Sequence, residues 1–123
     1  MAGCPPLAPS PVPLINLRTS LKAVEDADAL LKRLSSLLAR ETGKPEAYVM
    51  ALLDTNVPMT FAGTSDPSAY VEIKSIGALT PPAMTAAFSD LISEHTGIPI
   101  NRIYIGFEDV RADAWGWNGT TFG

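Results

Sequence analysis

The stretch LLARETGKPEAYV, residues 37–49, recurs as LISEHTGIPINRI, residues 91–103, at a constant offset of 54 positions. In each copy a glycine, Gly43 or Gly97, follows a run with apolar residues at helical spacing. Glycine in this place is typical of a helix end, because it adopts the left-handed backbone conformation without a steric penalty. The proline two residues later cannot continue a helix. Each copy therefore predicts a helix that ends at its glycine and leads into a strand.

The segments around the two copies follow the same order of strand, helix and strand. Apolar residues at spacings of three and four between Val24 and Leu38 predict the first helix. Thr80 as N-cap and the two prolines after it open the second helix, whose apolar face runs from Met84 to Ile92. Four strands are predicted, at Leu14 to Leu17, Tyr48 to Leu53 (a buried strand), Ala69 to Ile76 and Ile103 to Phe107. A loop is predicted from Asn56 to Asp66.

Two β-α-β units, each with a right-handed crossover, predict an α/β (α+β) fold with one four-stranded sheet and both helices on one face. One sheet face and the sheet edges then lack cover within a single chain, and open edges are a liability that proteins pair or cover. Charged residues make up 18% of the chain, below the usual ~25%, which indicates that part of the surface is hidden in an assembly. We therefore expect a closed oligomer.

Composition narrows the classes of protein to which the chain can belong. With 123 residues, 46% of them apolar, it is long enough for one domain with a real core. The net charge of −4 and the lack of a basic block argue against nucleic-acid binding, which needs clustered Lys and Arg. No apolar run approaches the ~20 residues that span a bilayer, so no membrane partner is expected. A single cysteine, Cys4, and a single histidine, His95, leave no disulfide framework and no His-rich metal site.

The first twelve residues differ in composition from the rest of the chain. Residues 1–12 carry four of the eleven prolines and no charge, a composition that favours extended polyproline conformations. We interpret them as a disordered tail or as an extension that is not part of the mature protein, and residues 13–123 as the folded domain. The features of a signal peptide are not visible. The expected location is the cytoplasm, with secretion without a signal peptide as the alternative.

Six short segments carry a resemblance to a known family. They are Pro13-Leu-Ile-Asn, Gly43-Lys44-Pro45 followed by Tyr48, Pro58-Met59-Thr-Phe61, Ser75-Ile76-Gly77, Arg102-Ile-Tyr104-Ile and Gly116-Trp117-Asn118-Gly-Thr-Thr-Phe122. In this order and spacing they resemble the macrophage migration inhibitory factor family of the tautomerase superfamily. The resemblance implies a homotrimer with its sheets around a central channel and its sites at the subunit interfaces. It also implies a keto–enol tautomerase without a cofactor, acting on small aromatic α-keto acids such as phenylpyruvate and on dopachrome.

The resemblance assigns the role of catalytic base to Pro13. A tautomerase removes a proton from the carbon next to a carbonyl, which requires a base that is unprotonated near neutral pH. A free α-amino group has an ordinary pKa of roughly 7.7–8.0, and an apolar pocket lowers the pKa further. In this chain Val12 acylates Pro13, and an amide nitrogen is no base. The activity is therefore conditional on cleavage after Val12 or on translation that starts at codon 12; otherwise Pro13 only starts an edge strand.

Three residues near the predicted helix and strand ends are candidate substrate ligands, and each also has a purely structural explanation. The resemblance implies that Lys44 binds the substrate carboxylate and stabilises the developing enolate. The alternative is a solvated lysine that the helix dipole favours. In the resemblance the backbone and side chain of Ile76, together with Ser75, line the pocket. Otherwise Ile76 is a core residue and Ser75 carries an ordinary hydroxyl at a strand end.

Aromatic residues near the C-terminus complete the predicted site. The resemblance places Tyr104 in the pocket of the neighbouring subunit, and Trp117 with Phe122 at the pocket rim, where they favour flat aromatic substrates. The alternative is that all three pack between subunits. Gly106 stands where vertebrate members carry an asparagine, and Trp115 adds a second indole. Both differences bear on substrate preference.

A signalling or interaction protein on the same scaffold is the competing class. Animal members of the family also act as cytokines, and such a protein would keep Pro13 blocked and bind a protein receptor instead of a substrate. The Cys-x-x-Cys pair that vertebrate members link to thiol oxidoreductase activity is replaced here by Ser68 and Val71. We therefore expect no such activity. The single cysteine and the single histidine leave no metal site expected, and the resemblance implies no cofactor. The N-terminal residue of the native protein separates the two classes, because a start at Pro13 favours catalysis.

Overall fold

The computed structural model describes residues 12–123, which form a four-stranded sheet, two long helices and a C-terminal hairpin. The sheet strands are β1 (Leu14–Thr19), β2 (Met50–Asp54), β3 (Ala69–Ser75) and β4 (Ile103–Asp109). The helices are α1 (Ala27–Thr42) and α2 (Pro81–Thr96), and the 3-10 turns are η1 (Glu46–Tyr48), η2 (Ile100–Arg102) and η3 (Ala112–Ala114). The hairpin pairs β5 (Gly116–Trp117) with β6 (Thr120–Thr121). Among these residues, no helix combines the length and the apolar character that a membrane crossing requires.

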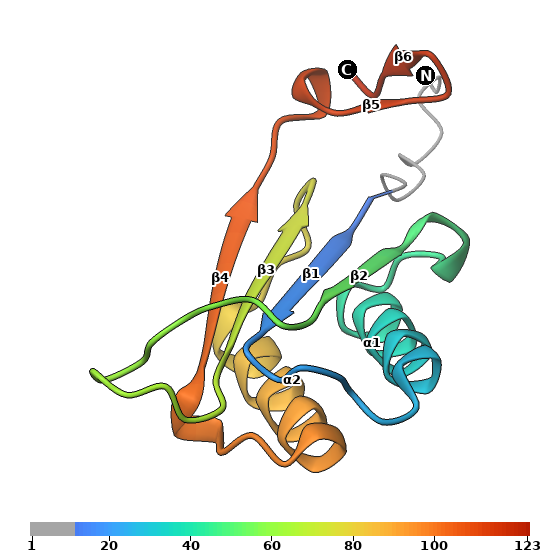
Figure 1. Cartoon of the computed structure of the whole chain (residues 1–123). Helices are drawn as coiled ribbons and strands as arrows, with labels where there is room; N and C mark the ends of the chain where they lie inside the picture. Colours follow the sequence, from blue (N-terminus) through green and yellow to red (C-terminus); the bar gives the residue numbers. More distant parts are fainter. Residues whose placement is uncertain (1–11) are drawn as a thin grey trace, which may run out of the picture.

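The sheet has the strand order β2-β1-β3-β4 (Figure 1). Strand β1 pairs with β2 in parallel, and β3 pairs with β4 in parallel. The two units join at the centre of the sheet, where β1 and β3 run antiparallel. The predicted fold of two β-α-β units with one four-stranded sheet is confirmed.

The two units keep the offset of 54 positions through both helices and the turns after them. Helix α2 starts and ends 54 positions after α1, and η2 does so relative to η1. Both helices end at the predicted glycines, with φ of 69° at Gly43 and 80° at Gly97. The threonine before each glycine donates its hydroxyl to the carbonyl four residues earlier, at 2.7 Å from Thr42 and 2.6 Å from Thr96. The Thr-Gly pair therefore closes each helix by a side-chain bond and a left-handed residue.

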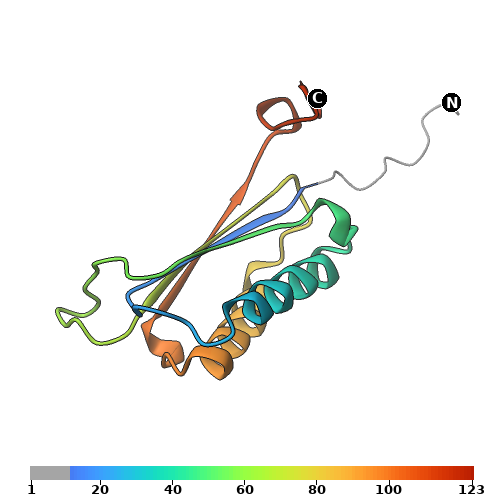
Figure 2. The same ribbon diagram turned by 45° about the vertical axis from the view of Figure 1, so that its right-hand side comes forward.

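Both helices cover the same face of the sheet, and the other face is bare (Figure 2). The core between the layers consists of Ile15, Leu17, Leu30, Leu34, Leu37, Leu38, Ala69, Val71, Ile73, Met84, Phe88, Ile92, Ile98 and Ile103. The strand residues among them alternate with residues that point to the bare face, as the pleat requires. The large apolar and aromatic side chains exposed on the bare face are Met50, Leu52, Tyr70 and Tyr104. This uncovered face agrees with the expectation that the chain is incomplete alone.

The prediction of a buried strand from Tyr48 to Leu53 is wrong in its start and in its burial. Tyr48 ends the 3-10 turn η1, and strand β2 begins only at Met50. Along β2, exposed residues alternate with half-buried ones. The physical reason is that β2 is an edge strand with only one face against the helices, so a continuous apolar run does not bring burial on both sides.

Several other boundaries differ by a few residues from the predictions. Strands β1 and β4 each extend two residues further, to Thr19 and Asp109, whereas β3 ends at Ser75, one residue before Ile76. Val24 precedes α1 instead of starting it. Thr80 occupies the N-cap position of α2, but its side chain makes no capping hydrogen bond. Of the predicted tail, residues 1–11 lie outside the described residues.

Candidate active site

Pro13 directly precedes β1 and is buried, as is Val12, which is 3% exposed. Its carbonyl oxygen accepts a hydrogen bond from the backbone N–H of Met50 at 3.1 Å. The register pairs Leu14 with Lys74 across β1 and β3, and one further step along these antiparallel strands brings Pro13 opposite Ser75. Pro13 therefore lies between the start of β2 and the end of β3.

A cavity of about 140 Å³ opens beside Pro13. Its lining residues are Val12, Pro13, Leu14, Tyr48, Met50, Trp115, Gly116, Trp117 and Phe122. The C-terminal segment that supplies the last four stands beyond the end of the sheet at which β1 starts (Figure 1). The structure thus brings Trp117 and Phe122, near the C-terminus, beside Pro13, near the N-terminus.

Aromatic rings contact one another around this cavity. Tyr48 meets Trp117 edge to face, with 5.7 Å between ring centroids and an interplanar angle of 85°. Trp117 stacks on Phe122 at 6.1 Å and 13°. Trp117 is 52% exposed, so its indole still presents a face to solvent. Such a rim suits a flat aromatic ligand, because aromatic pairs prefer offset stacking or edge-to-face contact.

Sequence reasoning missed Tyr48 as a member of the site. The apolar pattern predicts a strand at Tyr48, although the residue also belongs to the segment Gly43-Lys44-Pro45 followed by Tyr48 that carries the resemblance. The turn η1 rotates its ring toward the C-terminal hairpin instead of leaving it within a strand. The spacing within that segment was the signal that could have identified it.

Lys44 lies directly after the C-terminal end of α1 and is only 6% exposed. Its Nζ donates a hydrogen bond of 2.7 Å to the carbonyl oxygen of Ile76. Burial lowers the pKa of Lys44 from its ordinary 10.5, and the negative charge of Asp109 acts in the opposite direction. An ammonium has three donors, so the contact with Ile76 leaves two for a ligand carboxylate.

The turn after β3 is fixed by groups on β4 and just after it. The backbone N–H of Gly77 donates to Asp109 Oδ1 at 2.9 Å. The N–H of Val110 donates to the carbonyl of Ser75 at 2.8 Å. The side chain of Ser75 is fully buried, and its Oγ has no hydrogen-bond partner within residues 12–123. The structure therefore joins Lys44 to Ile76, but neither these two residues nor Ser75 belong to the lining of the cavity beside Pro13.

Tyr104 lies at the other end of the sheet from Pro13 in the same protomer. It pairs with Tyr70 near the start of β3 and β4. The end of β1 lies at the same end of the sheet, since Thr19 pairs there with Ala69. Its ring packs edge-on against Phe61 at 4.7 Å and is 66% exposed. Within one protomer Tyr104 does not reach the cavity beside Pro13.

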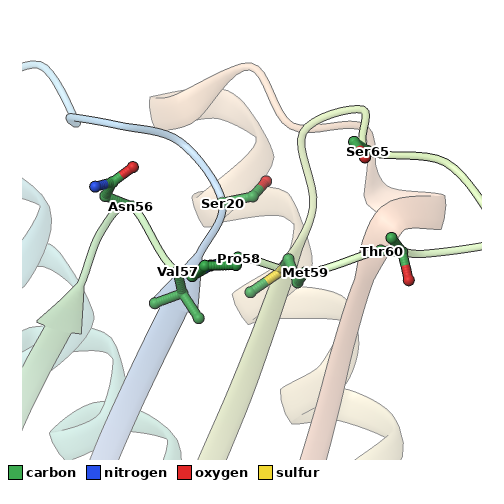
Figure 3. Close-up of a pocket in the computed structure, with 7 residues that line it drawn as sticks. All are labelled: Ser20, Asn56, Val57, Pro58, Met59, Thr60 and Ser65. Carbon is green, nitrogen blue, oxygen red and sulfur yellow. The ribbon is translucent and has the colours of Figure 1, made fainter.

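A larger cavity, of about 580 Å³, lies at the carboxyl ends of β1 and β2 (Figure 3). Its lining residues are Ser20, Asn56, Val57, Pro58, Met59, Thr60 and Ser65. None of these side chains titrates near neutral pH, and none carries a charge. The smaller cavity gains a group that titrates near neutral pH once the nitrogen of Pro13 is freed, which makes it the better candidate for proton-transfer chemistry.

Comparisons with known proteins agree on one family. The family model for macrophage migration inhibitory factor matches residues 12–123. The macrophage migration inhibitory factor homolog of Trichinella spiralis is 34% identical over 114 residues, which cover 90% of this chain and 100% of that protein. The macrophage migration inhibitory factor of Xenopus laevis is also 34% identical, with 90% and 99% covered. A crystal structure of the homologue from Prochlorococcus marinus superposes with a TM-score of 0.86 at 54% identity, covering 89% of this chain and 99% of that one.

Proposed function

Because the chain belongs to the macrophage migration inhibitory factor family, with the tautomerase superfamily fold, we propose that it is a keto–enol tautomerase of small aromatic α-keto acids such as phenylpyruvate. The observation that carries the proposal is the cavity in which Pro13 lies with two tryptophans, a tyrosine and a phenylalanine. An apolar aromatic wall beside a secondary amine favours both a flat substrate and a neutral base.

The proposed reaction needs a base, a carboxylate ligand and an aromatic wall. The freed Pro13 amine takes a proton from the carbon next to the substrate carbonyl, and the electron pair moves onto the carbonyl oxygen, which is then protonated to the enol. The ammonium of Lys44 binds the substrate carboxylate and stabilises the negative charge that develops on the enolate. Trp117 and Phe122 hold the ring, with Ile76 and Ser75 at the neighbouring strand end.

The position of Val12 bears on how the amine becomes available. Val12 acylates Pro13 and lines the same cavity, so removal of residues 1–12 frees the amine and widens the cavity at once. The family model begins at residue 12, which leaves residues 1–11 outside the matched segment. Both observations support a functional protein whose first residue is Pro13.

A homotrimer is part of the proposal, because Tyr104 lies away from the cavity in its own protomer and is largely exposed. A neighbouring protomer can offer its Tyr104 to the cavity beside Pro13, which places each site between two subunits. The exposed Met50, Leu52 and Tyr70 on the bare sheet face support an assembly that covers this face.

Two versions of the protein test the proposal, one that begins at Pro13 after removal of the initiator methionine and one that retains residues 1–12. We expect the first to tautomerise phenylpyruvate, with a rate that rises as the Pro13 amine loses its proton. The second should be nearly inactive while it assembles equally well, because acylation abolishes the basicity of the nitrogen. Pro13→Ala in the shorter protein is the matched control, because it keeps a free N-terminus but replaces the secondary amine.

Equal activity of the two versions would contradict Pro13 as the base. Inactivity of both would favour the competing class, a signalling or interaction protein that keeps Pro13 blocked. Intact mass and N-terminal sequencing of the protein from its native source then decide which version exists in the cell.

A further inference from the structure

We propose that Asp109 is a positioning residue, whose carboxylate orients the Ile76–Gly77 peptide group so that this group holds the ammonium of Lys44 ready for a ligand carboxylate. The inference rests on the proposed function for the identity of the ligand. The contacts themselves come from three elements: the end of α1, the turn after β3 and the end of β4.

A single peptide group connects the cation to the anion. The carbonyl of Ile76 accepts from Lys44 Nζ at 2.7 Å, and the N–H of the same peptide unit, that of Gly77, donates to Asp109 Oδ1 at 2.9 Å. In a trans peptide the carbonyl and the N–H point in opposite directions. The peptide dipole therefore lies between the two charges with its negative end at Lys44 and its positive end at Asp109, an arrangement in which each bond strengthens the other.

The left-handed backbone conformation at Gly77 is held in place by the hydrogen bond to Asp109. Gly77 has a φ of +72°, in the left-handed region, and Ala78 after it also has a positive φ of 62°. Such conformations persist where surrounding contacts impose them. The hydrogen bond from the Gly77 N–H to Asp109 is such a contact, and the bond from Val110 to the Ser75 carbonyl at 2.8 Å fixes the preceding peptide.

Asp109 also acts on Lys44 through its charge. Among the described residues it is the acidic group whose negative charge favours the ammonium form of Lys44 and partly opposes the effect of burial on its pKa. Glu108, the preceding residue on β4, points to the opposite sheet face, since successive side chains alternate. The two neighbouring carboxylates therefore differ in whether they face Lys44, and Glu108 serves as the control.

The first experiment follows Lys44 and Gly77 by NMR in the full chain. Asp109→Ala removes both the acceptor and the charge, so we expect faster amide exchange at Gly77, by about tenfold, and a lower pKa of Lys44. Asp109→Asn keeps an oxygen that can accept from Gly77, so Gly77 should stay protected while the pKa of Lys44 still falls. Glu108→Gln should change neither.

The second experiment measures binding of 3-phenylpropionate, an aromatic carboxylate that cannot tautomerise, to the protein that starts at Pro13, which retains every sheet strand and both helices. We expect Asp109→Ala to weaken binding about 3- to 10-fold, Asp109→Asn to weaken it less and Glu108→Gln to leave it unchanged. For phenylpyruvate turnover, KM should rise more than kcat falls, because the base is untouched.

The outcomes separate this inference from the proposed function. Unchanged Gly77 exchange and an unchanged Lys44 titration in Asp109→Ala would overturn the inference whatever the activity. Unchanged 3-phenylpropionate affinity in Asp109→Ala, or no binding to the protein that starts at Pro13, would overturn it as well. Binding that weakens as expected in a protein without tautomerase activity would support the positioning role and count against the proposed reaction alone.

Discussion

The guanidinium of Arg33 on α1 lies 3.2 Å from Nδ1 of His95 on α2, and it also donates to Glu94 at 3.1 Å. A guanidinium only donates, so Nδ1 of His95 accepts and the proton of the neutral ring is assigned to Nε2. That nitrogen lies 2.9 Å from the carbonyl of Glu25, to which it donates. One imidazole therefore bridges the second helix to the first helix and to the segment that leads into it, and so joins the two β-α-β units.

We expect His95→Ala to lower the free energy of unfolding by about 1 kcal/mol, because one part-buried and one exposed hydrogen bond are lost. His95→Gln is the control, since glutamine offers both an acceptor and a donor and should recover part of the loss. Urea denaturation at a fixed protein concentration measures the difference, because assembly makes stability concentration-dependent. A stability of His95→Ala equal to the wild type would show that the bridge contributes nothing.

Replacement of Lys44 by alanine should weaken catalysis through loss of carboxylate binding. A charge-assisted contact is worth roughly 1.5–3 kcal/mol, so kcat/KM for phenylpyruvate should fall about 10- to 150-fold. Lys44→Arg keeps the charge and should retain more activity, although a guanidinium fits the site differently. An unchanged kcat/KM in Lys44→Ala would leave Lys44 as a structural helix-end lysine.

The pH dependence of activity should reflect the lowered pKa of Lys44. Burial lowers the pKa of Lys44 from 10.5, so the ammonium loses its proton, and the substrate carboxylate its partner, at a pH below that value. We expect kcat/KM to decline at alkaline pH before 10.5 is reached. Lys44→Arg should abolish this decline, because arginine stays protonated. If the alkaline decline of kcat/KM persists unchanged in Lys44→Arg, it is caused by the titration of a group other than Lys44.

The same lowered pKa has a consequence for stability. Between the folded-state pKa of Lys44 and 10.5 the unfolded chain binds more protons than the folded one, so the contribution of Lys44 to the free energy of unfolding rises with pH. We expect the difference in stability between wild type and Lys44→Met to shift in favour of the wild type as pH increases through this window. Urea denaturation of both proteins over the same pH series measures it, and a difference that stays constant would contradict the prediction.

Mixed assemblies test whether the site is shared between protomers. If Tyr104 reaches the cavity of the neighbouring protomer, Lys44→Ala and Tyr104→Ala should each lower the activity. When the two variants are refolded together, some sites combine an intact Lys44 from one protomer with an intact Tyr104 from the other. With random mixing about a quarter of the sites are restored in a closed ring. We expect a sedimentation mass of three chains and, with both variants made in the protein that starts at Pro13, a rise in activity on mixing. A monomer, or no rise, would remove the shared site.

The residues that end each helix were predictable because their effects are local. Thr42-Gly43 and Thr96-Gly97 close their helices through a hydroxyl bond to the preceding turn and a left-handed residue, and neither interaction needs a distant partner. The repeated order of apolar patterns then led to the tandem β-α-β fold, since few topologies satisfy short right-handed connections. The prediction of a buried strand from Tyr48 to Leu53 failed because a short apolar run reveals neither where a strand begins nor which of its faces are covered.

The sequence by itself determined the helices, the sheet and, through the six segments, the family to which the chain belongs. Only the tertiary structure decided that Tyr48 and Trp115 line the cavity beside Pro13 and that one peptide group lies between Lys44 and Asp109. No periodicity encodes such contacts, because they join the ends of separate elements whose proximity arises from sheet register and from the path of the chain after β4. The local pattern specifies each element, whereas the geometry of the site depends on how the packed elements bring their ends together.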